Sequence, residues 1–75
     1  MSGPLAAVVL PDARAYDAGP FWLLHPESRA AVRWLMRHAS LESTWHRGSL
    51  VVEGRYVSVV VVAMRDAGLL VEGLR

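Results

Sequence analysis

Three histidines are the first residues to test for chemistry, because imidazole binds metal ions and transfers protons near neutral pH. No two of His25, His38 and His46 have the i, i+4 spacing that places two ligands on one helix face, and the chain contains no cysteine. The pattern therefore does not predict a metal site. We interpret His38 as a hydrogen-bonded residue near the end of a helix.

The acidic residues also lack a catalytic arrangement. Glu27, Glu42, Glu53 and Glu72 fall in separate predicted elements, whereas general acid–base catalysis needs two carboxylates held together in a pocket. The serines have no nucleophile-elbow context, and the glycines lack the lysine of a phosphate-binding loop. We therefore expect no catalytic residues, no cofactor and no enzymatic activity.

Arginines provide the clearest binding signal. Arg29, Arg33 and Arg37 recur every four residues, which places them together on one side of an amphipathic helix predicted over 25–39. The commonest role of such a stripe is a solvated helix face. Contact with an acidic protein surface is the next interpretation, and contact with nucleic-acid phosphates is the third, because the net charge is only +1.

Three tryptophans are an enrichment in 75 residues. Trp34 lies on the apolar face of the predicted helix and fits a core, whereas Trp22 and Trp45 fall in or beside predicted loops. Tryptophan and arginine dominate interface hot spots, although a small protein also uses large rings to build its core. The residues predicted to bind a partner are therefore Arg29, Arg33, Arg37, Trp22 and Trp45, with Phe21 as a further candidate anchor. A homodimer formed through a strand edge or an apolar helix face is an open alternative.

The elements that must position these residues are short. The sequence predicts a single domain over 1–75, with a strand over 5–10 at a sheet edge, a loop over 11–24, the helix over 25–39 and strands over 49–53 and 69–73. Pro26 suits the first position of the helix and Glu27 its first turn.

Residues 55–67 are compatible with either a strand or a helix. Four consecutive valines favour a strand, with Glu53 and Gly54 in a hairpin turn. A helix would end at Gly68 and would bury Tyr56, Val60, Ala63, Met64 and Ala67. We favour the helix, which gives an α+β fold with two helices packed on one face of a short β-sheet. The alternative is one helix on a three- to four-stranded antiparallel sheet.

Length and composition set the class of protein. A chain of 75 residues with 53% hydrophobic and 20% charged residues makes one folded domain, too small for a barrel enzyme or a complete dinucleotide-binding fold. All basic side chains except histidine are arginine, and lysine, isoleucine and asparagine are absent, which indicates a GC-rich bacterial or phage genome. The sequence shows no signal peptide or membrane span. We therefore expect a cytoplasmic location in a bacterial host.

One part of the chain resembles small proteins of phages and mobile elements from GC-rich bacteria. The resemblance runs from Trp45 to Val71 and consists of a tryptophan, a strand ending Leu-Val-Val-Glu, an Arg-Tyr that opens a helix and a closing Gly-Leu strand. In size and in its lack of catalytic residues the chain is also similar to anti-CRISPR proteins. That resemblance implies a non-enzymatic inhibitor that binds a type I CRISPR–Cas effector complex and sterically blocks target DNA recognition. Mimicry of DNA is not expected at net charge +1. The alternative is a small nucleic-acid-binding accessory or regulatory protein.

Overall fold

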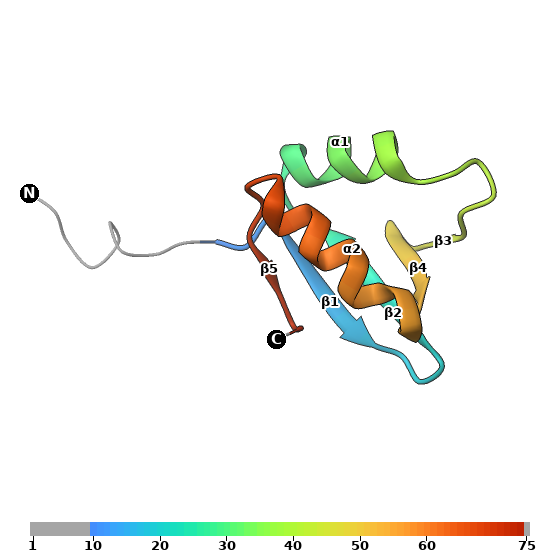
Figure 1. Cartoon of the computed structure of the whole chain (residues 1–75). Helices are drawn as coiled ribbons and strands as arrows, with labels where there is room; N and C mark the ends of the chain where they lie inside the picture. The colour runs from blue at the N-terminus through green and yellow to red at the C-terminus, as the bar shows by residue number, and fades with distance from the viewer. Residues whose placement is uncertain (1–9, 75) are drawn as a thin grey trace, which may run out of the picture.

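A computed structural model describes residues 10–74 as a five-stranded mixed sheet with two helices (Figure 1). The α+β class predicted from the sequence is therefore confirmed. The elements in chain order are β1 (Ala13–Asp17), β2 (Phe21–Pro26), α1 (Arg29–His38), β3 (Trp45–His46), β4 (Ser49–Glu53), α2 (Gly54–Asp66) and β5 (Val71–Glu72).

The sheet has the strand order β3-β4-β2-β1-β5. β1 pairs with β5 in parallel, and the three other neighbouring pairs are antiparallel. The β1–β2 hairpin turns at Gly19, whose φ of 88° is favourable only for glycine and whose amide donates to the Asp17 carboxylate at 3.0 Å. Side chains alternate between the two faces of each strand, so that Ala13, Ala15 and Leu24 are buried on one face.

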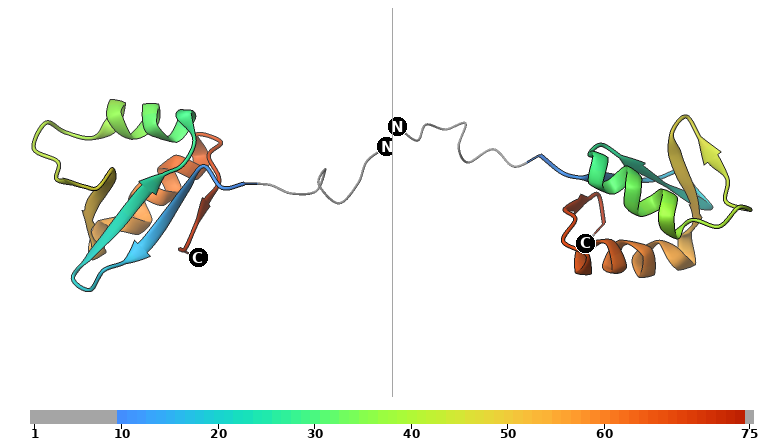
Figure 2. Two further views of the ribbon diagram at one scale, coloured as in Figure 1. Left: turned by 180° about the vertical axis from the view of Figure 1, so that it is seen from behind. Right: turned by 90° about the horizontal axis from the view of Figure 1, so that it is seen from above.

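One hydrophobic cluster contains buried residues of the sheet and of both helices. Figure 1 and the reverse view in Figure 2 show α2 crossing one side of the β1–β2 hairpin. Burial of aliphatic side chains from separate elements is the main source of stability in a domain of this size. The buried residues of the cluster are Ala13, Ala15, Leu24, Ala31, Leu35, Leu50, Val52, Val57, Val61, Met64, Leu69 and Val71.

The prediction of a loop over 11–24 is wrong. That range contains β1 and most of β2, and only the short connection between Asp17 and Phe21 is irregular. The connection contains Gly19 and Pro20 and is preceded by Asp17, residue types that are typical of turns. Two short strands are stable here because they pair with each other and with β4 and β5.

The start of the first helix is also displaced from the predicted position. His25 and Pro26 end β2, where Pro26 lies opposite Ala13, and the helix covers Arg29–His38 rather than 25–39. Ser28 is the N-cap, because its hydroxyl accepts a hydrogen bond from the Ala31 amide at 3.0 Å. Neither Pro26 nor Glu27 therefore lies in the first helical turn.

The helical interpretation of 55–67 is confirmed by α2, and Gly68 follows it with a left-handed φ of 89°. The predicted buried stripe is largely wrong, because the buried residues of α2 are Val57, Val61 and Met64. Of the predicted stripe only Met64 is fully buried; Val60 is partly buried, and Tyr56, Ala63 and Ala67 are exposed. The strand predicted over 69–73 narrows to Val71–Glu72. Most of the strand predicted over 5–10 lies outside the described residues.

Candidate protein-binding surface

Two of the three histidines, His25 and His38, contact other residues of the fold. The Nδ1 atom of His25 lies 2.9 Å from the Ser49 hydroxyl on the neighbouring strand. His38 stacks on the Trp34 ring at 4.1 Å between centroids, and its Nδ1 lies 2.8 Å from the Trp34 carbonyl oxygen. Within residues 10–74 no group of three or more histidine, aspartate or glutamate side chains is placed to hold a metal ion. The contacts of His25 and His38 are of the kind that stabilise the fold.

Asp12 fixes the start of α1 relative to the sheet. Its carbonyl oxygen accepts hydrogen bonds from the amides of Glu27 and Ser28 at 2.7 and 3.1 Å, and its carboxylate accepts one from the Leu70 amide at 2.8 Å. The Leu70 amide, and secondly the Ser28 side chain, hold the pKa of Asp12 below its ordinary value by stabilising the charged form. The sequence pattern did not identify Asp12, because its partners lie far from it in the chain.

The arginine stripe occupies the exposed side of α1. Ala31 and Leu35 are buried in the core, and Arg29, Arg33 and Arg37 are solvent-exposed on the other side of the helix. Between residues 10 and 74, none of these three arginines forms an ion pair within 4.0 Å. Their positive charge is therefore available to a partner.

Other arginines do have partners within the chain. Arg14 binds Glu27 at 3.1 Å and Glu72 at 3.2 Å, and the hydrogen bond to Glu27 is the main reason that the pKa of Arg14 is raised. Arg55 lies 3.0 Å from the Glu53 carboxylate, and Arg65 donates to the backbone carbonyls of the C-terminal segment. Among residues 10–74, the arginine stripe differs from these three arginines in making neither an ion pair nor a hydrogen bond to another residue's side chain or carbonyl.

Exposed apolar side chains adjoin the stripe. Val32 and Met36 lie three residues after Arg29 and Arg33 respectively, and residues three apart are neighbours on a helix surface. The Met36 side chain is 65% exposed, and Leu41 in the following turn is fully exposed. Met36, Leu41 and Trp45 line a shallow depression of about 200 Å³. We define the α1–β3 surface as Arg29, Val32, Arg33, Met36, Arg37, Leu41 and Trp45.

Four of the five residues predicted to bind a partner therefore belong to this surface, and Trp22 does not. Trp22 lies on the core face of β2 opposite Val52, is partly buried, and its ring borders Gly54 at the start of α2. Trp45, by contrast, is 38% exposed in β3 at the edge of the sheet. Sequence reasoning missed Val32, Met36 and Leu41. The helical spacing signalled the first two, but the position of Leu41 depends on the turn after α1.

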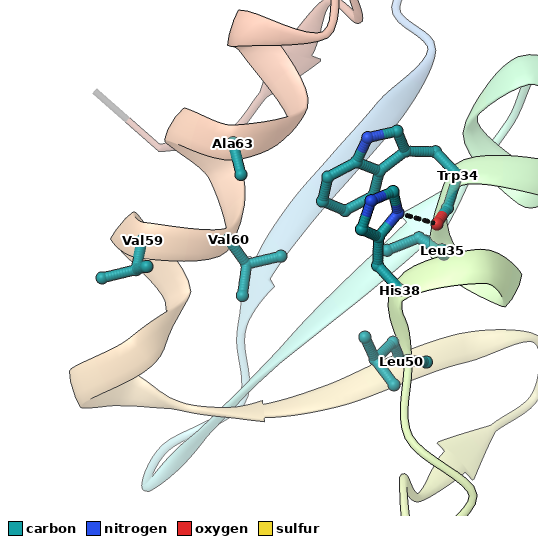
Figure 3. A pocket seen from close by; sticks show the side chains of 8 residues that line it. Trp34, Leu35, His38, Leu50, Val59, Val60 and Ala63 are labelled. Atoms are coloured by element: carbon teal, nitrogen blue, oxygen red, sulfur yellow. Dashed lines mark hydrogen bonds between the residues drawn. The ribbon is translucent and has the colours of Figure 1, made fainter.

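A second hollow lies between α1 and α2 and has a volume of about 190 Å³ (Figure 3). Trp34 and His38 line it from α1, and Val60 and Ala63 line it from α2. The lining is almost wholly apolar, and His38 is its one titratable side chain among the described residues. The hollow can provide apolar contacts, but it does not bring together an acid, a base and a nucleophile.

Comparison of the chain with known protein families, curated proteins and solved structures finds no match. In the part of the chain that the structure describes, neither helix has the length and apolar character needed to cross a bilayer.

Proposed function

We propose that this chain is a non-enzymatic protein-binding domain whose α1–β3 surface contacts an acidic surface on another protein. The observation that supports the proposal is the combination of three exposed arginines, none ion-paired within residues 10–74, with the adjoining apolar side chains of Met36, Leu41 and Trp45. In the proposed arrangement both helices cover one face of the sheet, and the outer side of α1 is left to the partner.

The chemistry of this surface suits protein recognition. Tryptophan, methionine and arginine are enriched at protein interfaces, and a few such residues carry most of the binding free energy. An apolar centre formed by Met36 and Trp45 would exclude water from the contact. The flanking guanidinium groups of Arg33 and Arg37 would pair with carboxylates and steer the partner toward the surface.

The partner that we propose is a subunit of a type I CRISPR–Cas effector complex. The resemblance to anti-CRISPR proteins supports this choice, as do the small size and the net charge of +1, which is unsuited to imitating DNA. Binding in one-to-one proportion would place an 8.3 kDa domain against the complex and block access of target DNA sterically. No reaction and no cofactor are part of this mechanism.

Pull-down and affinity measurement against purified type I complexes test the proposal. We expect Arg33→Glu combined with Met36→Ala to weaken binding by at least about tenfold, since both a charge contact and an apolar contact are lost. Ala18→Glu introduces a negative charge in the exposed turn between β1 and β2, at the end of β2 opposite to α1, and is the control that retains binding. Absence of binding to every type I complex would refute the choice of partner. Equal effects of the two variants would refute the choice of surface.

Nucleic acid is the second candidate partner, and the same arginine stripe is the observation that favours it. Contacts between Arg29, Arg33, Arg37 and phosphates would give an affinity that falls steeply with salt concentration. A gel shift at low salt would then show binding that is lost when the stripe is neutralised. No shift at low salt would remove this alternative.

A further inference from the structure

The outer face of α2 carries two exposed valines between two opposite charges. Val59 is 66% exposed and Val62 is 54% exposed. Arg55 precedes them by four residues and Asp66 follows them by four, and both charged residues are exposed. At 100° per residue, these four side chains fall within about 60° of one another around the helix axis. They form one narrow stripe, which we call the α2 stripe.

The α2 stripe is complementary to the same stripe on a second copy of the chain when the two helices run in opposite directions. If two α2 helices pack antiparallel about a twofold axis at the level of residues 60 and 61, Arg55 of one copy meets Asp66 of the other. The same symmetry places Val59 against Val62. We propose that the α2 stripe is a homodimer interface occupied by a second copy of this chain, because charge and apolar character both match under this single operation.

The dimensions of the helix fit this arrangement. Eleven residues separate Arg55 from Asp66, which is about 16.5 Å along the axis, and two such helices can overlap over that whole length. The spacing of four, three and four residues along the stripe is the spacing of the contact positions in coiled coils. Ser58 and Ala63, which are exchanged by the same twofold axis, are small and allow close approach of the two helices.

The two charged residues at the ends of the α2 stripe differ in their contacts within one chain. Arg55 pairs with Glu53 at 3.0 Å and lies 4.7 Å from the centre of the Tyr56 ring. Because that ion pair is exposed and joins residues two apart in sequence, it is weak and competes little with a second copy. Asp66 forms no ion pair within 4.0 Å among residues 10–74. Dimerisation gives this carboxylate a cationic partner.

The α2 stripe adjoins the hollow between the two helices but is separate from the α1–β3 surface. Val59 borders the hollow, and Figure 3 shows its side chain turned away from α1, whereas the side chain of Val60 is directed toward the hollow. None of the stripe residues belongs to the α1–β3 surface. Dimerisation and partner binding can therefore be tested independently, and failure of one proposal leaves the other standing.

The experiment measures the molecular mass of the full chain by sedimentation velocity from about 10 µM to about 1 mM, a range suited to a small helix–helix interface. We expect a monomer of 8.3 kDa at the low end and a dimer at the high end. Arg55→Glu alone and Asp66→Arg alone each replace two attractive pairs by two repulsive ones, because the twofold axis repeats every contact. Each should raise the dimer dissociation constant by about tenfold or more.

Restoration of pairing is the decisive result. An equimolar mixture of the Arg55→Glu and Asp66→Arg chains has attractive pairs at both ends, and so has the chain that carries both substitutions. Both should dimerise within about threefold of the unaltered chain. Circular dichroism of each variant shows whether the fold is retained. The mixture contains only the two chains already measured alone, so its dimerisation cannot be attributed to a further substitution. A chain that stays monomeric at 1 mM, or a dimer that the charge exchange does not restore, would overturn the proposal.

Discussion

Replacing Val61 or its neighbour Val62 by alanine distinguishes the buried from the exposed face of α2. Val61 is fully buried in the core, whereas Val62 is 54% exposed. The two positions carry the same side chain in the same helix, so that helix propensity changes equally in both variants. Only the environment of the removed methyl groups differs.

The magnitude follows from that environment. Alanine in place of Val61 removes two methyl groups, worth about 0.8 kcal/mol each in transfer free energy, and leaves a small cavity that costs about 1 kcal/mol more. Alanine is the better helix former by about 0.5 kcal/mol, so the net loss is about 2 kcal/mol. For a domain of this size that lowers Tm by about 8–16 °C. At Val62 the same replacement should change stability by no more than about 0.5 kcal/mol.

The assay is thermal unfolding followed by circular dichroism at about 5 µM, where association of copies contributes little. Urea unfolding gives the free energy for the same two variants, and an unchanged dependence on denaturant shows that the unfolded states are comparable. Equal losses at Val61 and Val62 would show that α2 does not present the Val57–Val61–Met64 face to the sheet. A larger loss at Val62 would reverse the assigned orientation of the helix.

Three further predictions concern the contacts that hold the elements together. Gly73→Ala should destabilise the fold more than Gly68→Ala in urea titrations. Both residues have φ near 90°, but only at Gly73 would an added Cβ collide with the β1 backbone. Equal losses of stability would refute the close approach of Gly73 to β1. The hydrogen bond from the Leu70 amide favours the charged form of Asp12 and lowers its pKa in the folded state. This contribution to the free energy of unfolding should be present above about pH 4 and should be lost as the pH falls through the lowered pKa. Asp12→Asn should therefore flatten the decline between pH 5 and pH 3, and an unchanged decline would contradict this. Ser28→Ala should cost about 1 kcal/mol through loss of the N-cap, measured by the same titration.

Local patterns were sufficient for several elements of the fold. The arginine spacing predicted the exposed side of α1, the strand over 49–53 has the predicted bounds, and Gly68 marked the end of α2. These features depend on residues close together in the chain. The candidate surface was predictable to the same extent: the arginines were found from their period, and Trp45 from its type.

Other features depend on pairing between distant segments. Residues 11–24 resemble a loop in isolation, and they become strands because β1 and β2 pair with each other and with β4 and β5. The buried side of α2 was misassigned for the same reason. Apolar residues surround most of that helix, so periodicity alone could not select Val57 and Val61 as the face that meets the sheet.

The sequence by itself determined the α+β class, the helical period of α1 and the arginine stripe, since these follow from side-chain type and short spacing. Only the tertiary structure decided that Met36, Leu41 and Trp45 meet beside that stripe and that Trp22 lies elsewhere. It also decided that the α2 stripe faces outward, because burial of one helix side requires a sheet to pack against. Spacing along the chain specifies which residues share a face, and packing specifies which face remains in solvent.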